Sequence, residues 1–195
     1  MANCDDQSQF HVIDETLIST WTENITRAHP LHLLSGCRIV AAEHRKKIQG
    51  SEHEYIVLQT VYRGIQQYVR VERRPSKPSP LWLQFGAGVL AQDTVIMSPT
   101  NFDESGSYAL YTMHFPEATG PNLLDLAATL SAIISLAPRY HLYTSSCYWF
   151  ARMVFEGLKH LFRGEVMEGE WDYSIWQPPF SEKPPFTPKC YMETL

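Results

Sequence analysis

Long hydrophobic runs and a surplus of positive charge are both missing from this chain of 195 residues. The most apolar stretch, residues 123–137, contains Asp125 and several hydroxyl side chains, and it falls short of the roughly 20 apolar residues that a membrane-spanning helix needs. Lys and Arg number 16 against 21 Asp and Glu, which gives a formal net charge of −5. No broad basic surface is therefore available to neutralise phosphates. We expect no transmembrane span and no nucleic-acid partner.

Cysteine is scarce, and its spacing excludes two common uses. The four cysteines are Cys4, Cys37, Cys147 and Cys190, with no Cys-x-x-Cys pair among them. This pattern argues against a zinc site and against a disulfide framework. The N-terminal residues carry acidic side chains instead of the basic and then apolar order of a secretory signal. We expect reduced thiols and an intracellular, cytoplasmic location.

Sequence motifs that hold metals or phosphates are also absent. The chain has no Gly-rich phosphate loop, no Gly-x-Ser-x-Gly and no His-Glu-x-x-His. His29 and His32 are close together, but Pro30 lies between them and no neighbouring Cys or carboxylate completes a ligand set. We expect neither a metal nor a cofactor.

The composition that remains is typical of a globular protein. Apolar residues make up 44% of the chain and aromatic residues 12%, which is enough to form a sizeable core. Prolines and tryptophans cluster near the C-terminus. We predict a single domain over residues 1–170, followed by a Pro/Trp-rich tail over residues 171–195 that packs on the domain or extends from it.

Three segments have helical spacing. In the first, apolar residues recur at every fourth position between Asp14, a predicted cap, and Pro30, which ends the helix. These apolar residues are Leu17, Trp21 and Ile25. The second segment spans residues 122–136, with Asn122 as its cap, and the third runs from about 145 to 164.

Strand-forming residues dominate the middle of the chain. Residues 53–62 and 66–73 are rich in Val, Ile, Leu and Tyr, and the intervening Arg63-Gly64-Ile65 indicates a hairpin. Further strands are expected at residues 81–85, 94–97, 108–115 and 140–144. The resulting order predicts an α+β fold, in which helices pack on an antiparallel sheet.

Cys147 lies at the predicted start of the last helix, directly after Ser145 and Ser146. We expect these two hydroxyl groups to cap the helix. Amide N–H groups and the positive end of the helix dipole stabilise a thiolate at this position, and the thiolate is the nucleophilic form of cysteine. The competing interpretation is a small buried residue in an apolar helix, which is the usual environment of a free cysteine.

The segment around this cysteine reads Tyr140-His-Leu-Tyr-Thr-Ser-Ser-Cys-Tyr-Trp-Phe150. It resembles the Tyr-x-Leu-x-x-x-Asn-Cys-x-x-Phe segment of the circularly permuted papain-like thiol enzymes. That group includes the lecithin:retinol acyltransferase-like proteins, the NlpC-like hydrolases and the PPPDE desumoylating isopeptidases. Ser146 stands where the family has Asn. The resemblance implies a papain-like fold in permuted order, with a nucleophilic Cys147 at a helix start.

The same resemblance places the general base upstream, on an early strand. His53 begins the strand His53-Glu-Tyr-Ile-Val-Leu and fits this position. Histidine suits the task because its ordinary pKa of about 6.5 lets it accept and return a proton near neutral pH. An exposed histidine at a strand end is the competing interpretation, and His114 and His141 are rival candidates.

Three further residues are candidates for supporting roles. The family has a third residue that orients the imidazole, and Glu72 is the carboxylate on the polar face of residues 66–73. An exposed polar strand face explains Glu72 equally well, so we assign it no role. Tyr148 and Trp149 follow the cysteine and are predicted to line a groove for the substrate, although packing in the core is the alternative.

These residues predict a cysteine-dependent hydrolase or acyltransferase that acts on an amide, ester or thioester carbonyl. Cys147 would attack the carbonyl and His53 would transfer protons. The substrate would be a small acyl compound or a peptide, and transfer to water would make the protein a thiol protease or amidase. The alternative is a non-catalytic interaction protein with the same fold, which binds a protein partner through the tail 171–195.

Overall fold

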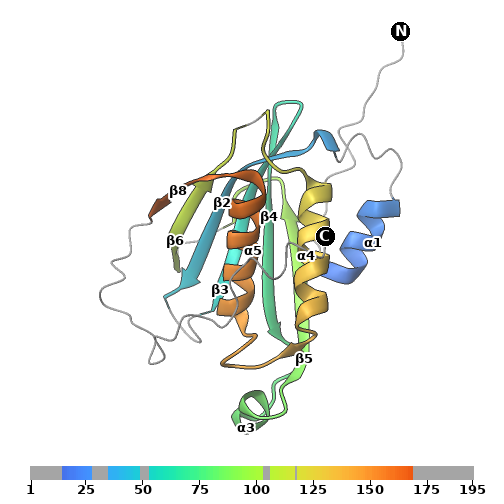
Figure 1. Cartoon of the computed structure of the whole chain (residues 1–195), viewed down its shortest axis with the longest axis vertical. Helices are drawn as coiled ribbons and strands as arrows, with labels where there is room; N and C mark the ends of the chain where they lie inside the picture. The colour runs from blue at the N-terminus through green and yellow to red at the C-terminus, as the bar shows by residue number, and fades with distance from the viewer. Residues whose placement is uncertain (1–14, 28–34, 49–52, 103–105, 117, 169–195) are drawn as a thin grey trace.

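A large antiparallel sheet forms the middle of the molecule in the computed structural model (Figure 1). The structure describes residues 15–27, 35–48, 53–102, 106–116 and 118–168. The sheet has eight strands in the order β1-β5-β4-β3-β2-β6-β8, and β7 pairs with β5. The fold is therefore α+β with an antiparallel sheet, as the order of elements in the sequence predicted.

Most strands are long, and β1, β7 and β8 are short. The strands are β1 (Thr16–Leu17), β2 (Arg38–Lys47), β3 (Glu54–Tyr62), β4 (Ile65–Pro75), β5 (Val89–Ser98), β6 (Ser107–His114), β7 (Arg139–Tyr140) and β8 (Glu165–Glu168). The helices are α1 (Ile18–Arg27), α3 (Leu81–Phe85), α4 (Leu123–Leu136) and α5 (Cys147–Phe162). No helix in the described part of the chain is long and apolar enough to cross a bilayer.

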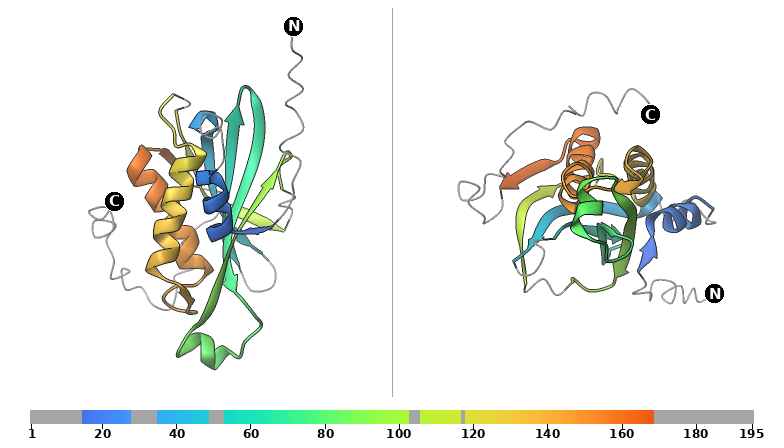
Figure 2. Two further views of the ribbon diagram at one scale, coloured as in Figure 1. Left: turned by 90° about the vertical axis from the view of Figure 1, so that its right-hand side faces the viewer. Right: turned by 90° about the horizontal axis from the view of Figure 1, so that it is seen from below.

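Helices α1, α4 and α5 cover one face of the sheet (Figure 2). Side chains alternate between the two faces of a strand, so Ile56 and Leu58 of β3 and Val69 and Val71 of β4 point into the core beneath these helices. Each of the four is 0% exposed, and burial of such a side chain stabilises the fold by about 1.5–3 kcal/mol. The helix-covered face is the hydrophobic core of the molecule.

The hairpin between β3 and β4 has the predicted position and a two-residue turn. Arg63 and Gly64 both have positive φ angles, 49° and 77°, which is the conformation of a type I′ turn. The turn pairs Tyr62 with Ile65, and the register continues along both strands to pair Tyr55 with Glu72. The start of β3 and the end of β4 are therefore fixed side by side.

The second predicted helix is confirmed as α4. The side-chain oxygen of Asn122 accepts hydrogen bonds from the N–H groups of Leu124 and Asp125 at 2.8 and 3.1 Å. The Asp125 carboxylate in turn accepts from the N–H of Asn122 at 2.9 Å. This reciprocal pair is a capping box, and such caps stabilise a helix by about 1 kcal/mol.

Other sequence-based expectations are corrected. Residues 81–85 form helix α3 instead of a strand, because Pro80 can start a helical turn and its carbonyl accepts from the N–H of Leu83 at 3.0 Å. Leu17 is exposed and belongs to β1, while Ile18 takes its place in the core. Strands β2 and β8 were not predicted. Several predictions concern residues outside the described ranges, namely Cys4, Asp14, His29, His32, Cys190 and the tail 171–195.

Candidate active site

One end of the sheet brings together two strand ends and a helix start. His53 directly precedes β3, Glu72 lies near the end of β4, and Cys147 is the first residue of α5. Helix α5 packs on both of these strands. Residues that are far apart in the sequence therefore meet where the two strand ends lie beneath the start of α5.

The Cys147 thiol and the His53 imidazole lie close enough to shift each other's pKa. Burial alone would raise the pKa of Cys147, but the hydrogen bond and charge of His53 and the backbone N–H of Glu54 bring this pKa below its ordinary value. Burial alone would lower the pKa of His53, but hydrogen bonds with Cys147 and Glu72 raise it instead. Both shifts favour a thiolate beside an imidazolium.

Glu72 binds the imidazole of His53. Its Oε2 lies 3.1 Å from Nε2 of His53, which leaves Nδ1 as the ring nitrogen available to the thiol. Arg70 donates to the same oxygen at 2.7 Å, and Arg74 forms an ion pair with Oε1. Burial acts to raise the pKa of Glu72, but the hydrogen bond from His53 and the charges of Arg70 and Arg74 lower it to about 2. Glu72 is therefore ionised at neutral pH and can orient the imidazole.

The burial of Glu72 differs from what the polar strand face suggested. Its side chain is 0% exposed. The sequence alone was equally compatible with an exposed polar residue at this position. The neighbouring Arg70 forms an ion pair with it and places its guanidinium 4.1 Å from the centre of the Tyr55 ring. Charged residues on one strand thus pair with each other, which the alternation of residue types does not predict.

The turn before α5 is fixed by Ser145, not by helix capping through both serines. The Ser145 hydroxyl donates to the carbonyl of Arg139 at 2.7 Å and accepts from the N–H of His141 at 3.2 Å. Ser146 occupies the N-cap position, but its side chain makes no capping hydrogen bond. The prediction that both hydroxyl groups cap the helix is wrong, because Ser145 closes the preceding turn.

Arg73 supports the same turn from within the core. It is 0% exposed, and it binds both carboxylate oxygens of Asp93 at 2.6 and 2.7 Å. Its Nη1 donates to the carbonyl of Ser145 at 3.4 Å, and its guanidinium lies 5.3 Å from the ring centre of Trp149. This buried bidentate pair connects β4 and β5 to the residues that precede Cys147.

Tyr140 is a further neighbour of the thiol that sequence analysis assigned no role. It is 5% exposed, and its phenol lies close enough to Cys147 for the two groups to interact electrostatically. Burial and the nearby Cys147 raise the pKa of Tyr140 far above its ordinary value, so the phenol keeps its proton and can donate it to a thiolate. The sequence feature that could have identified Tyr140 is its match to the first position of the Tyr-x-Leu-x-x-x-Asn-Cys segment.

The two predicted substrate-binding residues have different environments. Tyr148 is 37% exposed, and its hydroxyl accepts a hydrogen bond from Arg152 at 3.1 Å. Trp149 is partly buried and packs against the core. The rival histidines lie elsewhere: His114 is exposed at the end of β6, and the imidazole of His141 lies against Gly88.

A buried ion pair lies on the helix-covered face beside this site. His44 Nε2 and Glu54 Oε2 are 2.8 Å apart, and the side chains are 3% and 5% exposed. The imidazole of His44 packs near the rings of Tyr111 and Phe155. Sequence analysis missed this pair because it predicted no strand at β2, which carries His44.

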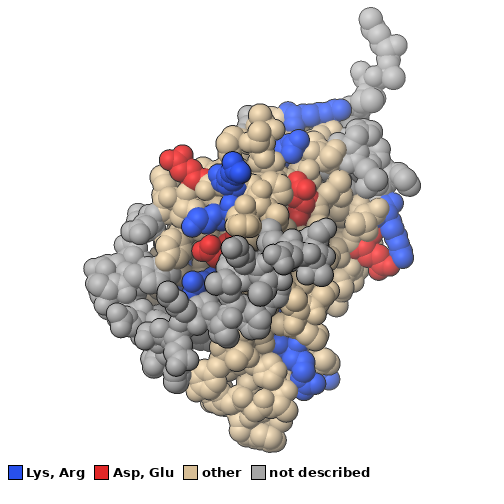
Figure 3. Space-filling view, viewed as in Figure 1, with Lys and Arg blue, Asp and Glu red and all other residues tan. Residues whose placement is uncertain are grey.

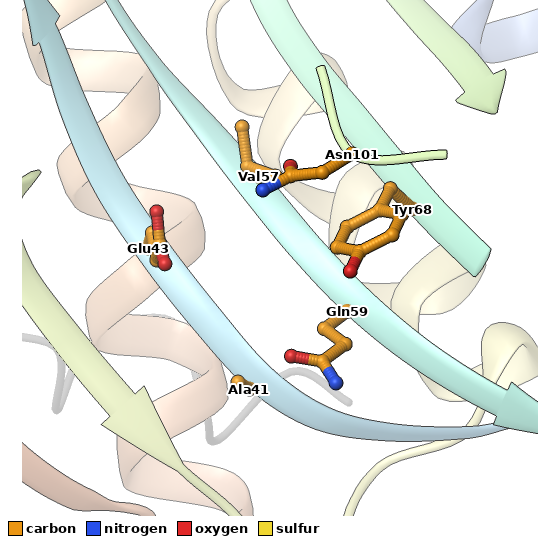
Figure 4. A pocket seen from close by; sticks show the side chains of 6 residues that line it. All are labelled: Ala41, Glu43, Val57, Gln59, Tyr68 and Asn101. Atoms are coloured by element: carbon orange, nitrogen blue, oxygen red, sulfur yellow. The ribbon is translucent and has the colours of Figure 1, made fainter. Parts of the chain in front are cut away.

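A small hollow lies on the face of the sheet away from the helices, the face that also carries Arg70 and Glu72. Cys147, His53 and Glu72 do not line it. Its volume is about 80 Å³, and its walls come from β2, β3, β4 and the segment after β5 (Figure 4). The lining residues are Ala41, Glu43, Val57, Gln59, Tyr68 and Asn101. The helices lie behind the sheet in this view, so the hollow and the helix start are on different sides.

Within the described ranges, no group of three or more His, Cys, Asp or Glu side chains is arranged to hold a metal ion. No protein-family model, curated protein or solved structure matches this chain. The functional assignment therefore depends on the geometry around Cys147.

Proposed function

We propose that this protein is a cysteine-dependent hydrolase or acyltransferase that acts on an amide, ester or thioester carbonyl. The observation that carries the proposal is the placement of Cys147 beside His53, whose imidazole is hydrogen-bonded to the buried carboxylate of Glu72. A nucleophile, a base and a group that orients the base are the three parts that covalent catalysis by a thiol needs. The lowered pKa of Cys147 supports the same role.

In the proposed reaction, the Cys147 thiolate attacks the substrate carbonyl carbon. Backbone N–H groups at the start of α5 stabilise the negative charge on the carbonyl oxygen. The imidazolium of His53 gives its proton to the departing amine, alcohol or thiol as the bond to the carbonyl carbon breaks. His53 then removes a proton from water, an alcohol or an amine, which attacks the thioester and releases Cys147. Glu72 stabilises the imidazolium throughout the cycle.

The order of the site residues along the chain supports a papain-like fold in permuted order. The histidine lies at the start of β3, and the cysteine follows the large sheet at the start of α5. This order agrees with the family that the Tyr140–Phe150 segment resembles. We also propose an intracellular location, because the described cysteines Cys37 and Cys147 are free thiols and a low-pKa thiol stays active in a reducing compartment.

A non-catalytic binding protein with the same fold is the second candidate. Two observations favour it: Ser146 replaces the family Asn, and Cys147 does not line the described hollow. In such a protein the thiol would keep its environment but no substrate would reach it. Reactivity of the thiol together with turnover of a thioester separates the two candidates.

The test is iodoacetamide alkylation of each cysteine across about pH 5 to 9, measured by peptide mass, against the ordinary thiol pKa of about 8.5. Cys147 should react well below that pKa in the native protein and should lose this advantage in His53→Ala. Cys37 is the internal control, because burial raises its pKa, so it should react slowly in both proteins. A Cys147 that titrates like a free thiol in both proteins overturns the enzyme assignment.

Turnover is the second measurement, on a panel of acyl thioesters, esters and amides. Cys147→Ala should remove all activity, and intact-mass analysis should detect an acyl adduct in the native protein. His141→Ala is the matched control, because this histidine lies close in sequence but against Gly88. A reactive thiol without adduct or turnover on any member of the panel supports the binding protein instead.

A further inference from the structure

A small helical projection stands out from the end of the sheet that carries the site (Figure 1). It contains α3 and connects β4 to β5. Its surface, together with an adjoining residue of β5 and one of the segment before α5, exposes large apolar side chains that we call the α3 surface. They are Leu81, Trp82, Phe85, Leu90 and Tyr143, with exposed fractions of 62%, 69%, 41%, 66% and 65%.

The α3 surface is held in place by specific contacts. The rings of Phe85 and Tyr143 stack with their centres 4.8 Å apart. The N–H of Leu142 donates to the carbonyl of Gln84 at 3.0 Å, and Arg139 donates to the carbonyls of Ala87 and Gly88 at 3.0 and 2.7 Å. These bonds join the projection to the turn before Cys147. A fixed cluster of exposed apolar side chains is typical of a binding surface.

The charge around this surface differs from that of the whole chain. Residues 76–92 and 136–155 contain no Asp or Glu, although the chain has a net charge of −5. Lys77 precedes α3 in the same connection, Arg139 pairs with Leu90, and both are exposed. The next acidic residue along the chain, Asp93, is paired with Arg73. On the face shown in Figure 3, the lower end of the molecule has basic atoms and no acidic ones.

We propose that the α3 surface docks on an anionic lipid bilayer. Trp82, Leu81 and Leu90 would enter the interface between headgroups and acyl chains, where an exposed tryptophan and aliphatic side chains are stabilised. Lys77 and Arg139 would face the lipid phosphates, and each such charge contributes about fivefold in affinity near an anionic surface. The acidic parts of the chain would face away from the bilayer.

Charge is the reason to choose a bilayer over a protein partner. An exposed apolar patch alone suits either partner, but a projecting tip that combines aromatic, aliphatic and basic side chains and lacks acids fits an anionic interface. Residues 143–147 connect the α3 surface to the proposed nucleophile, so docking would hold Cys147 near the lipid surface. This consequence rests on the proposed function, whereas docking itself does not.

The test is co-sedimentation of the full chain with phosphatidylcholine vesicles with and without about 30% phosphatidylserine. We expect binding to the anionic vesicles and quenching of tryptophan fluorescence by brominated lipids. Leu81→Ser/Trp82→Ser should reduce binding at least about tenfold and remove the quenching that arises from Trp82. Lys77→Glu reverses one charge and should reduce binding roughly 30-fold.

Two matched controls lie away from the α3 surface. Ile65 is 53% exposed at the β3–β4 turn, at the opposite end of the sheet, so Ile65→Ser should bind like the native protein. Lys159 is exposed near the end of α5, and Lys159→Glu should have little effect. Circular dichroism and thermal melts establish that every variant is folded.

Three results would overturn the docking proposal. The first is no binding of the folded native protein to the anionic vesicles. The second is equal loss of binding in Ile65→Ser and in the double variant. The third is a native oligomer that the double variant dissociates without any vesicle binding, which would make the α3 surface a contact between copies of the chain. Cys147→Ala should still bind vesicles, so failure of the enzyme assignment and failure of docking are separate outcomes.

Discussion

Replacing Glu72 by Gln tests the electrostatic argument for the site directly. The amide retains the size of the carboxyl group but removes its charge from a position that is 0% exposed. The pKa of Glu72 falls from 4.5 to about 2 in the folded protein, which corresponds to about 3 kcal/mol of favourable interaction for the ionised form. We therefore expect Glu72→Gln to lower the free energy of unfolding by roughly 3 kcal/mol at neutral pH.

The pH dependence of this loss has a definite sign. A carboxylate whose pKa is lower in the folded state stabilises the protein fully above its unfolded pKa of 4.5, and this stability disappears as the pH falls toward 2. The difference between native and variant proteins should therefore be constant above about pH 5 and shrink below it. Urea unfolding from about pH 2 to 8 measures this difference.

The same substitution should also affect the thiol. A neutral amide cannot stabilise an imidazolium as the Glu72 carboxylate does, so in Glu72→Gln the pKa of His53 should fall and the thiolate should lose part of its partner's charge. The inflection in Cys147 alkylation should move to higher pH. Glu43→Gln is the control, because Glu43 is 36% exposed in its pair with Arg45 and such pairs contribute at most about 1 kcal/mol. A loss of stability that is independent of pH, together with unchanged alkylation, would refute the reasoning.

Two further substitutions examine the supports of Cys147. Tyr140→Phe removes the phenol that interacts with the Cys147 thiol. The inflection in Cys147 alkylation should therefore move to higher pH, while the His53 pKa, followed by NMR, stays raised. An unchanged inflection would mean that the phenol does not stabilise the thiolate. Arg73→Met removes the partner of Asp93 from the core, so urea unfolding should show a loss of about 3–5 kcal/mol. A loss below about 1 kcal/mol would show that Asp93 is compensated in another way.

The elements that local chemistry specifies were the ones that sequence analysis predicted well. Asn122 and Asp125 are three residues apart and satisfy each other's backbone groups, so the start of α4 can be predicted from neighbouring residues. Gly64 next to Arg63 sets the β3–β4 turn in the same way. These features depend on contacts within a few residues.

The elements that were wrong or missed depend on distant partners. Strand β2 lies between β3 and β6. It was not predicted because it contains charged residues such as Arg45 and Lys46. Lys46 is nevertheless 6% exposed. Residues 81–85 have strand-like composition, but they lie beyond the sheet where no strand pairs with them as an extended segment. Whether such a segment becomes a strand depends on its pairing in the sheet, and the local sequence does not encode the pairing partner.

For the site, the sequence by itself determined which residues have the chemistry: a cysteine at a helix start and a histidine at the start of an early strand. The tertiary structure decided that His53 and not His114 or His141 meets the thiol, and that Glu72 binds the imidazole. The reason is physical. Helix position follows from short-range spacing, whereas the burial and the charged neighbours that set a pKa come from residues distant in sequence, which only the packing of α5 on β3 and β4 brings together.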